Sequence, residues 1–569
     1  MNALRRLSGL HLVRVYLWTL SFLKPIQLLF LVYYRLRGPV SGPSASPHVV
    51  LREGVGFKIE HNAVPSSPDN LSFTFLNREK RFSTEVDWAS KEMPKLWRYN
   101  LHYFDYLLDS KRSVGQKCRL LTDWIHGNPP GTDDAWEPYP LSLRIVNWIK
   151  FLLLEHDLPK QSDGRYHEWV ESLYRQALWL ERNIEYHILA NHYLKNGKAL
   201  FFAGTFFSGT DADRWRAKGL KILTEEAVEQ FLADGGHYER SLMYHSICLE
   251  DYLDVINLMS GTPCRADQDM GTRFTKLTQR GLDFLHDVCL PDGEIPLFND
   301  AAFGIAPSPD HLFEYARCVT GYLRPVSSAT MTTVEKTETG YFVVRHGQDM
   351  MIVDCGAGGP DYQVGHAHCD ALSYELALNG RRVIVDSGVF DYESTPERAY
   401  ARSTRAHNTV MIDGMEQSEI WGVFRMARRA RPLGGTLRPL NGTGSRFEGM
   451  HDGYSRLPGK VHHKRLIEYD GTCLWTVLDE VTGMGNSTAE SYIHFHPDYS
   501  VQQNEAGLAI VKNDGKAIGQ LEILGNASFR VDQGRYFPEF GRAEETTVLV
   551  LSCVGTLPLQ FGYRVRKDC

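Results

Sequence analysis

The sequence has little of what marks several common classes of protein. Its ten cysteines are scattered without a Cys-x-x-Cys pair, so no disulfide framework is indicated and reduced, buried thiols are expected. A formal net charge of -7 argues against general nucleic-acid binding, yet it is compatible with an anionic ligand, which needs only local positive charge. No Gly-x-Ser-x-Gly motif is present, so a serine nucleophile is not indicated.

A long uninterrupted apolar run is also missing. Residues 15–34 are mostly apolar, but Lys24-Pro25 divides them into pieces too short to cross a bilayer. We expect residues 1–40 to form amphipathic helices that cover the adjoining domain or rest on a membrane surface. No convincing cleavage site follows them, so a secretion signal is not expected.

The chain of 569 residues is long enough for two or more domains, and its apolar periodicity changes along its length. Up to about residue 322, apolar residues recur every three or four positions, as in Leu141, Ile145 and Trp148, which predicts helices. From about residue 340 the period is two, which predicts short antiparallel strands.

A stretch rich in proline, serine and threonine at residues 325–333 separates the two patterns. We therefore expect a helical domain over residues 41–325 and an antiparallel β-sandwich over residues 326–569. A cleft between two domains of different architecture is the natural place for a ligand.

The most informative segment is Gly365-His366-Ala367-His368-Cys369-Asp370. Its histidines, with Asp386 and His407 further along, offer the neutral nitrogens and hard oxygen that a zinc-like ion binds. Two histidines two positions apart face the same way in extended backbone, and a metal usually takes one of them. The other histidine would then be available for chemistry.

The geometry of a predicted hairpin constrains this site. Alternating apolar residues on both sides of Asn379-Gly380 predict a two-residue turn. That turn places Asp386 opposite Ser373 and leaves His368 about five residues, roughly 16 Å, further along the strand. The segment before Ala371 must therefore fold back across the sheet if His368 and Asp386 are to share a metal. From spacing alone, polar loop positions remain an equal interpretation.

Polar residues interrupt apolar faces in two predicted helices of the first domain. One contains Asn191 and His192, and the other runs through the segment 234–245. If the second helix begins at His237, then His237, Arg240 and Tyr244 share one stripe, and a cation beside the phenol would lower its pKa from about 10. Each residue alone also fits a satisfied polar group in the core, but together they suggest acid/base chemistry.

In combination, these motifs resemble the heparinase II/III-like polysaccharide lyases. The resemblance rests on segments 191–194, 235–245, 365–370, 385–388 and 402–408, in this order. It implies an N-terminal incomplete α/α toroid followed by a C-terminal antiparallel β-sandwich. It also implies an enzyme that cleaves a uronic-acid-containing anionic polysaccharide by β-elimination.

The resemblance implies a role for each residue of the site. Elimination needs a partner for the uronate carboxylate, a base for the C5 proton and an acid for the leaving O4. Asn191 and His192 would bind the carboxylate, and Tyr244 would protonate O4 and, in a syn elimination, first take the C5 proton. His366 would be the alternative base or a further carboxylate contact. A structural zinc ion is implied on His368, Asp386 and His407.

Further residues are expected to contact substrate, and the sequence does not decide which sandwich-domain tyrosine reaches the site. These residues are His237, Glu239, Arg240, Trp136, Tyr139, Tyr392, Tyr400 and Arg405.

Two other functions remain open from the sequence. An α/α-toroid glycoside hydrolase would use carboxylates such as Asp234 and Glu239, facing each other at roughly 5 to 9.5 Å. A saccharide-binding protein of polysaccharide biosynthesis would keep the fold without turnover. The expected partner is an anionic polysaccharide and not nucleic acid, with peripheral membrane association through the N-terminus. The resemblance favours a periplasmic or membrane-associated location over the cytoplasm, and the oligomeric state is not indicated.

Overall fold

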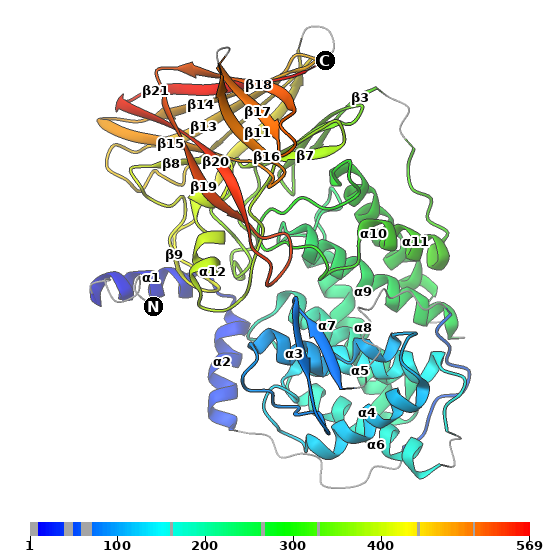
Figure 1. The fold of residues 1–569 in the computed structure, drawn as a ribbon. Coiled ribbons are helices and arrows are strands. Elements are labelled where there is room, and N and C mark those ends of the chain that lie inside the picture. The colour runs from blue at the N-terminus through cyan, green and yellow to red at the C-terminus, as the bar shows by residue number, and fades with distance from the viewer. Residues whose placement is uncertain are drawn as a thin grey trace.

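The computed structural model describes residues 9–38, 49–58, 71–159, 163–262, 268–326, 330–440, 444–504 and 507–568. Helices make up most of the N-terminal part, drawn in blue to green in Figure 1, and strands make up most of the C-terminal part, drawn in green to red. This arrangement confirms the predicted fold class of a helical region followed by antiparallel sheets.

The helices of the N-terminal part are long, and several begin at residues favoured as N-caps, such as Ser113, Asp163 and Ser308. The helices are α1 (Gly9–Ser21), α2 (Pro25–Arg37), α3 (Lys95–Tyr103), α4 (Val114–Gly127), α5 (Pro138–Leu154), α6 (Gly164–Arg182), α7 (Ala190–Phe206), α8 (Thr210–Gln230), α9 (Leu242–Gly261), α10 (Gln268–Val288) and α11 (Pro309–Thr320). A small hairpin, β1 (Ser72–Phe75) and β2 (Arg78–Arg81), precedes α3.

The C-terminal part contains three larger sheets, and all of their strand pairs among the described residues are antiparallel. The five-stranded sheet has the order β3 (Met331–Lys336), β4 (Tyr341–His346), β5 (Asp349–Asp354), β6 (Tyr374–Leu378) and β7 (Arg381–Ile384). The four-stranded sheet has the order β19 (Ser528–Tyr536), β20 (Glu544–Thr556), β15 (Asn486–His494) and β8 (Val410–Ile412).

The third and largest sheet has eight strands and packs on the other two. Its order is β11 (Pro432–Pro439), β12 (Ser445–His451), β13 (His462–Tyr469), β14 (Leu474–Thr482), β21 (Leu559–Lys567), β18 (Ala517–Gly525), β17 (Gly507–Lys512) and β16 (Tyr499–Asn504). One buried apolar cluster joins the sheets, since it contains Phe342 of β4, Trp475 of β14 and Leu549 of β20. The short helix α12 (Pro396–Ala401) and the pair β9 (Ile420–Gly422) and β10 (Arg425–Met426) complete this part.

The hairpin predicted around Asn379-Gly380 is confirmed as β6 and β7. Leu378 pairs with Arg381 across a turn whose two residues have φ angles of 53° and 77°, which asparagine and glycine tolerate best. The predicted fold-back toward Asp386 is also confirmed, because the ring of His368 lies 5.3 Å from that of His407, which is hydrogen-bonded to Asp386.

Helices α1 and α2 lie at one side of the molecule, where the helical part meets the sheets (Figure 1). Within the described part of the chain, no single helix is long and apolar enough to span a membrane. Residues 11–21 and α2 reach that length and composition only as a pair, and the pair bends by 111°.

Candidate active site

A cleft of about 970 Å³ lies between the helical part and the sheets. Both parts of the chain contribute polar and aromatic side chains to it, as expected for a ligand site. Residues that line it include Tyr139, Asn191, His192, Tyr244, His366, Tyr392 and Phe424. Most of the residues predicted to perform chemistry therefore line one cavity, although they come from segments far apart in the sequence.

Tyr244 lies on the helical wall of the cleft. Its ring stacks on that of His366, with 4.0 Å between the ring centroids and 13° between the ring planes. Its hydroxyl lies 3.1 Å from the hydroxyl of Tyr392. Burial raises the pKa of Tyr244 well above that of a free tyrosine, so the phenol stays protonated and can donate a proton.

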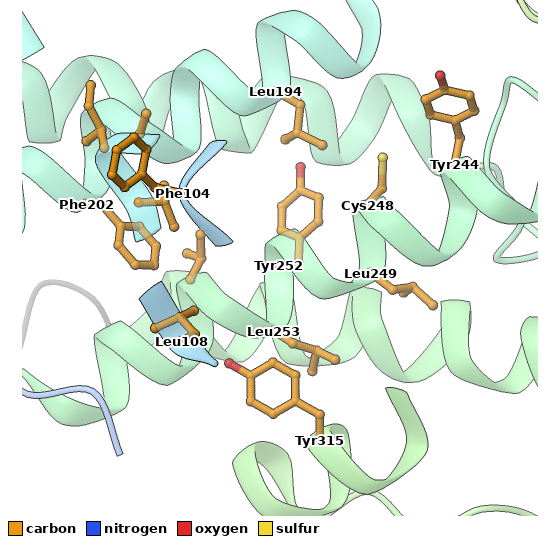
Figure 2. Packing of buried hydrophobic residues seen from close by; sticks show 14 of the residues in the cluster. Phe104, Leu108, Leu194, Phe202, Tyr244, Cys248, Leu249, Tyr252, Leu253 and Tyr315 are labelled. Atoms are coloured by element: carbon orange, nitrogen blue, oxygen red, sulfur yellow. The ribbon is translucent and has the colours of Figure 1, made fainter. Parts of the chain in front are cut away.

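The position of Tyr244 is set by α9. Figure 2 shows Tyr244, Cys248 and Tyr252 projecting from the same side of this helix, as residues four positions apart do. The helix begins at Leu242, however, and not at His237 as the predicted stripe required. His237 is instead buried, with its Nε2 hydrogen-bonded to a side-chain oxygen of Gln230.

Arg240 takes no part in the stripe on α9, which corrects a second prediction. Its backbone has a φ of 55°, and its guanidinium donates to the carbonyl oxygens of Tyr238, Thr339 and Glu338 at 2.8, 2.8 and 3.1 Å. Arg240 therefore joins the two parts of the chain. The predicted lowering of the pKa of Tyr244 is wrong, because burial raises that pKa and this cation is engaged elsewhere.

A buried carboxylate orients His366. Nδ1 of His366 is hydrogen-bonded to Oε2 of Glu239, whose residue is only 2% exposed. Burial alone would raise the pKa of Glu239, but the neighbouring His366 lowers it below its ordinary value, so the carboxylate is charged. With Nδ1 engaged, Nε2 is the ring nitrogen available to a ligand. Glu239 thus reaches the site through His366 and does not itself line the cleft.

Asn191 and His192 stand in the first turn of α7. The chain enters this helix through Leu189 and Ala190, which have φ angles of 64° and 53°, and such strained backbone is common at functional sites. Nδ1 of His192 lies 2.9 Å from Oε1 of Glu185. Glu185 is not among the residues predicted from the sequence, and the close spacing of this acid and His192 is the signal that could have pointed to it.

Ion pairs that were not among the predicted features underlie another part of the cleft. Lys195 and Lys198 on α7 both bind Asp251 on α9, at 2.7 and 2.8 Å, and Lys150 binds Asp254 at 2.6 Å. The lysines and Asp254 line the cleft. Buried lysines are normally paired in this way. The signal in the sequence is the spacing: Lys195 and Lys198 are three residues apart in one apolar helix, and Asp251 and Asp254 are three apart in another.

Besides Arg240 and Glu239, four of the residues expected to contact substrate lie outside the cleft lining. Trp136 is buried, and its Nε1 donates to the carbonyl oxygen of Asn128, so it is a core residue. His237 is buried as described above. Tyr400 lies near His494, and the guanidinium of Arg405 is 5.7 Å from the ring of Tyr400. Of the two candidate tyrosines, Tyr392 is therefore the one that reaches the cleft.

A group that could hold a metal ion lies behind the cleft. His368, Asp370 and His407 are buried, and one ligand atom from each lies within 4.8 Å of the others. Nδ1 of His368 and Nε2 of His407 have no hydrogen-bond partner among the described residues. Two unpartnered imidazole nitrogens and a carboxylate fit a divalent cation. Burial raises the pKa of Asp370 to about 6, as expected where buried negative charge lacks a full counterion.

Asp386 differs from its predicted role in this group. Its Oδ2 lies 2.8 Å from Nδ1 of His407, so it contacts the ring on the side away from Nε2. The carboxylate that groups with His368 and His407 is that of Asp370, whereas the predicted one was that of Asp386. Asp300 lies 2.8 Å from Nε2 of His368, and so contacts the nitrogen of His368 that is opposite the unpartnered Nδ1. Such carboxylate partners orient metal-binding histidines.

Solved structures show which fold this is. A crystal structure of heparinase III matches with a TM-score of 0.68 at 19% identity, over 95% of this chain and 88% of that one. A heparan sulfate lyase HepC mutant from Pedobacter heparinus matches with a TM-score of 0.60 at 18% identity, over 86% of this chain and 80% of that one. The fold is therefore that of heparinase III.

The sequence matches the family descriptions "Heparinase II/III N-terminus" over residues 23–306 and "Heparinase II/III-like, C-terminal" over residues 334–563. The chain therefore belongs to the heparinase II/III-like family of polysaccharide lyases.

Curated relatives are distant. A heparin-sulfate lyase of Pedobacter heparinus is 24% identical over 401 residues, which are 66% of this chain and 57% of that protein. A heparin-sulfate lyase of Bacteroides thetaiotaomicron is 22% identical over 528 residues, which are 82% of this chain and 71% of that protein. The chain thus spans little more than half the length of the first relative.

Proposed function

We propose that the protein is a polysaccharide lyase that cleaves a uronic-acid-containing anionic polysaccharide by β-elimination. The observation that carries the proposal is the stack of Tyr244 on His366, within hydrogen-bond reach of Tyr392 and in the same cleft as Asn191 and His192. Elimination needs an acid, a base and a carboxylate partner within one sugar residue of each other, and this set supplies all three.

The carboxylate of the uronate would bind at the start of α7. The amide of Asn191 can donate a hydrogen bond to it, and His192 in its protonated form can donate from Nε2, because Nδ1 is held by Glu185. Both contacts strengthen as removal of the C5 proton pushes negative charge onto the carboxylate. Asn191 and His192 therefore stabilise the carbanion.

Proton transfers are assigned to His366 and Tyr244. Nε2 of His366 takes the C5 proton, and the paired carboxylate of Glu239 stabilises the charged ring that results. As the bond between C4 and O4 breaks, Tyr244 gives its phenolic proton to O4, and the sugar keeps a C4=C5 double bond. The raised pKa of Tyr244 favours this acid role over that of a base.

Contacts of the acidic residues make the hydrolase interpretation less favourable. Asp234 accepts hydrogen bonds from the backbone and side chain of Thr339 at 2.8 and 2.7 Å, and it does not line the cleft. Glu239 is bound to His366. A glycoside hydrolase needs two carboxyl groups facing the scissile bond, and these two do not fill that role.

We also propose that the metal group holds a structural zinc ion, with His368, Asp370 and His407 as protein ligands. When bound, the ion would fix the segment around residue 368 relative to the sheets. His368→Ala should lose bound metal and melt at a lower temperature, as measured by elemental analysis and calorimetry. A variant with wild-type metal content and melting would remove the ion from the proposal.

The proposed activity is tested by its product. Purified protein is incubated with heparan sulfate and a panel of other anionic polysaccharides, and new reducing ends and ultraviolet absorbance are measured together. Elimination produces both, because the C4=C5 double bond is conjugated with the carboxylate. Reducing ends without absorbance would establish hydrolysis instead. Binding without either product across the panel would support a non-catalytic saccharide-binding protein.

A further inference from the structure

Helices α1 and α2 expose far more apolar surface than their packing explains. On α1, the side chains of Val13, Leu17 and Leu20 form a stripe with exposed fractions of 56, 62 and 45%. On α2, the stripe consists of Leu29, Val32 and Leu36, with exposed fractions of 64, 58 and 82%. Soluble surfaces seldom present contiguous apolar side chains in this way, and such patches usually mark an interaction site.

The polarity of α2 is inverted relative to an ordinary surface helix. Its packed face is tied to the helical domain by polar groups, because Gln27 is only 2% exposed and donates to the carbonyl oxygen of Ile188 at 3.3 Å. Arg37 on the same face donates to the side chain of Asn183 at 2.6 Å. The ring of Phe30 also packs on that of Tyr186, with 4.4 Å between centroids, but the aliphatic residues of the stripe face outward, where an ordinary surface helix has polar residues.

Helix α1 is held in the same manner on the sheet side. The ring of Tyr16 packs against Trp421 with 4.6 Å between centroids, and the indole of Trp421 donates to the hydroxyl of Thr19. Arg14 pairs with Glu419 at 3.2 Å. These contacts fix the packed face and leave the stripe of Val13 and Leu17 outward.

Charge identifies the partner. Residues 1–52 contain seven lysine and arginine residues and no aspartate or glutamate, in a chain whose net charge is -7. Three of the seven, Arg14, Lys24 and Arg52, pair with acidic residues elsewhere in the chain. Trp18 and Tyr33 are 42 and 47% exposed beside the apolar stripes, and Arg35 is exposed next to Leu36. Apolar, aromatic and basic side chains on one short helix are the combination that enters the headgroup region of anionic lipids.

We infer that α1 and α2 dock this protein on the surface of an anionic lipid bilayer, with their apolar stripes at the boundary between headgroups and acyl chains. A second copy of the chain is a poorer occupant of the same surface, because two-fold pairing would bring its basic residues together. A lipid surface instead offers negative charge to them.

Docking there would place the cleft beside the membrane. The side-chain amide of Gln27 on α2 also donates to the carbonyl oxygen of Tyr362 at 3.4 Å. Gln27 therefore contacts the helical part through Ile188 and the C-terminal part through Tyr362. Ile188 lines the cleft, as does Gln363, the neighbour of Tyr362. The cleft therefore lies directly behind α2, and a polymer that reaches it would do so close to the bilayer.

The inference is tested by sedimentation of the full-length protein with vesicles of neutral phosphatidylcholine, or of phosphatidylcholine mixed with anionic phosphatidylglycerol. The triple variant Leu29→Gln, Val32→Gln, Leu36→Gln should bind anionic vesicles roughly a hundredfold more weakly. Arg35→Gln should weaken binding about fivefold, and high salt should do likewise. The matched control replaces three exposed apolar residues elsewhere, Val228→Gln, Leu323→Gln and Val554→Gln, and should bind like wild type.

Several outcomes would overturn the inference. Wild-type protein that stays in solution with anionic vesicles would do so, as would equal binding by the α2 triple variant and the control. If the wild-type protein is a dimer and the triple variant is a monomer, the surface belongs to a second copy of the chain. Protein that resists extraction by alkaline carbonate would be inserted across the bilayer instead of docked on it. Unchanged melting of the triple variant separates lost binding from lost folding.

Discussion

Two acidic side chains prepare the candidate catalytic histidines at the scale of single residues. Glu239 holds Nδ1 of His366, and Glu185 holds Nδ1 of His192 at 2.9 Å. In both cases the other nitrogen of the ring remains for substrate. The acids are 2 and 4% exposed, so each ring is held by a buried partner. In the proposed reaction this orientation would lower the cost of reaching the transition state.

Replacement of Tyr244 by phenylalanine tests the proposed acid directly. Tyr244→Phe should lower kcat/KM about 10²- to 10⁴-fold, the usual contribution of a general acid. Its unfolding free energy should change by only about 1 kcal/mol, because one hydrogen bond to Tyr392 is lost. Tyr400→Phe makes the same change outside the cleft and should retain wild-type activity in the ultraviolet assay. Full activity in Tyr244→Phe would contradict the proposed role.

Glu185 is predicted to act through His192. Glu185→Gln keeps the shape of the side chain but removes a charged hydrogen bond, so kcat/KM should fall about tenfold or more. The loss should appear mainly in kcat, since the contact tightens as charge develops on the uronate. Glu171→Gln is the matched control, because Glu171 pairs with His167 at 3.2 Å on the surface. Equal activity of the two variants would exclude the positioning role.

At the scale of elements, α7, which carries Asn191 and His192 in its first turn, packs closely on α8. Glycines let these helices approach closely. A Cβ atom at Gly219 would lie 2.4 Å from the backbone nitrogen of Phe201, and one at Gly204 would lie 2.3 Å from that of Arg216. Distances this short cannot be relieved by a side-chain rotation, because both partners are backbone atoms.

A methyl group at this contact should therefore destabilise the protein. Gly219→Ala should lower the free energy of unfolding by about 1 to 3 kcal/mol, since α8 must move away from α7. The same substitution at Gly115 in α4 meets no atom within 4 Å and should leave stability unchanged or raise it slightly. Thermal melting of the two variants makes the comparison. Equal melting temperatures would show that the helices can separate without cost.

At the scale of the whole molecule, the cleft exists because helices and sheets are joined along one side by buried polar contacts. Asp300 shows this most clearly, since it is fully buried between Arg398 of α12 and His368. These partners hold the pKa of Asp300 below its ordinary range despite its burial. Several histidines of the helical part are buried too, and they make stability depend on pH.

Stability should fall as the pH falls below about 6.5, the pKa of an unfolded histidine. Burial lowers the pKa of His102 and His245 to about 3 and that of His237 to about 4. Between those values and 6.5 the unfolded chain binds more protons than the folded protein, so acid favours unfolding. Each histidine contributes up to about 1.4 kcal/mol per pH unit.

Melting temperatures measured between about pH 7 and about pH 5 check this dependence. His245→Gln keeps a donor for the carbonyl oxygen of Gly281 and removes one titrating group, so its slope should be shallower than that of wild type by about one proton. A melting temperature that does not change with pH would contradict the prediction. An unchanged slope in His245→Gln would show that His245 does not contribute.

Much of the fold could be read from local pattern. The change of apolar period near residue 330, and the turn at Asn379-Gly380, act within a few residues, and both lead to the observed elements. The start of α9 was mispredicted by five residues. Arg240 interrupts the segment with a left-handed φ of 55°, and its side chain binds the carbonyl oxygen of Thr339; such a long-range contact leaves no periodic signal.

The sequence by itself determined the order of the two architectures, the turn of the β6–β7 hairpin and the residue types of the site, because periodicity and turn chemistry are local. Only the tertiary structure decided that Tyr392 reaches Tyr244, that Asp370 joins His368 and His407, and that Arg240 does not stack on Tyr244. Those choices depend on how segments far apart in the sequence cross one another, 148 residues apart for Tyr244 and Tyr392 and 99 for Arg240 and Thr339. The physical reason is that a side chain's partner is set by the packing of whole elements.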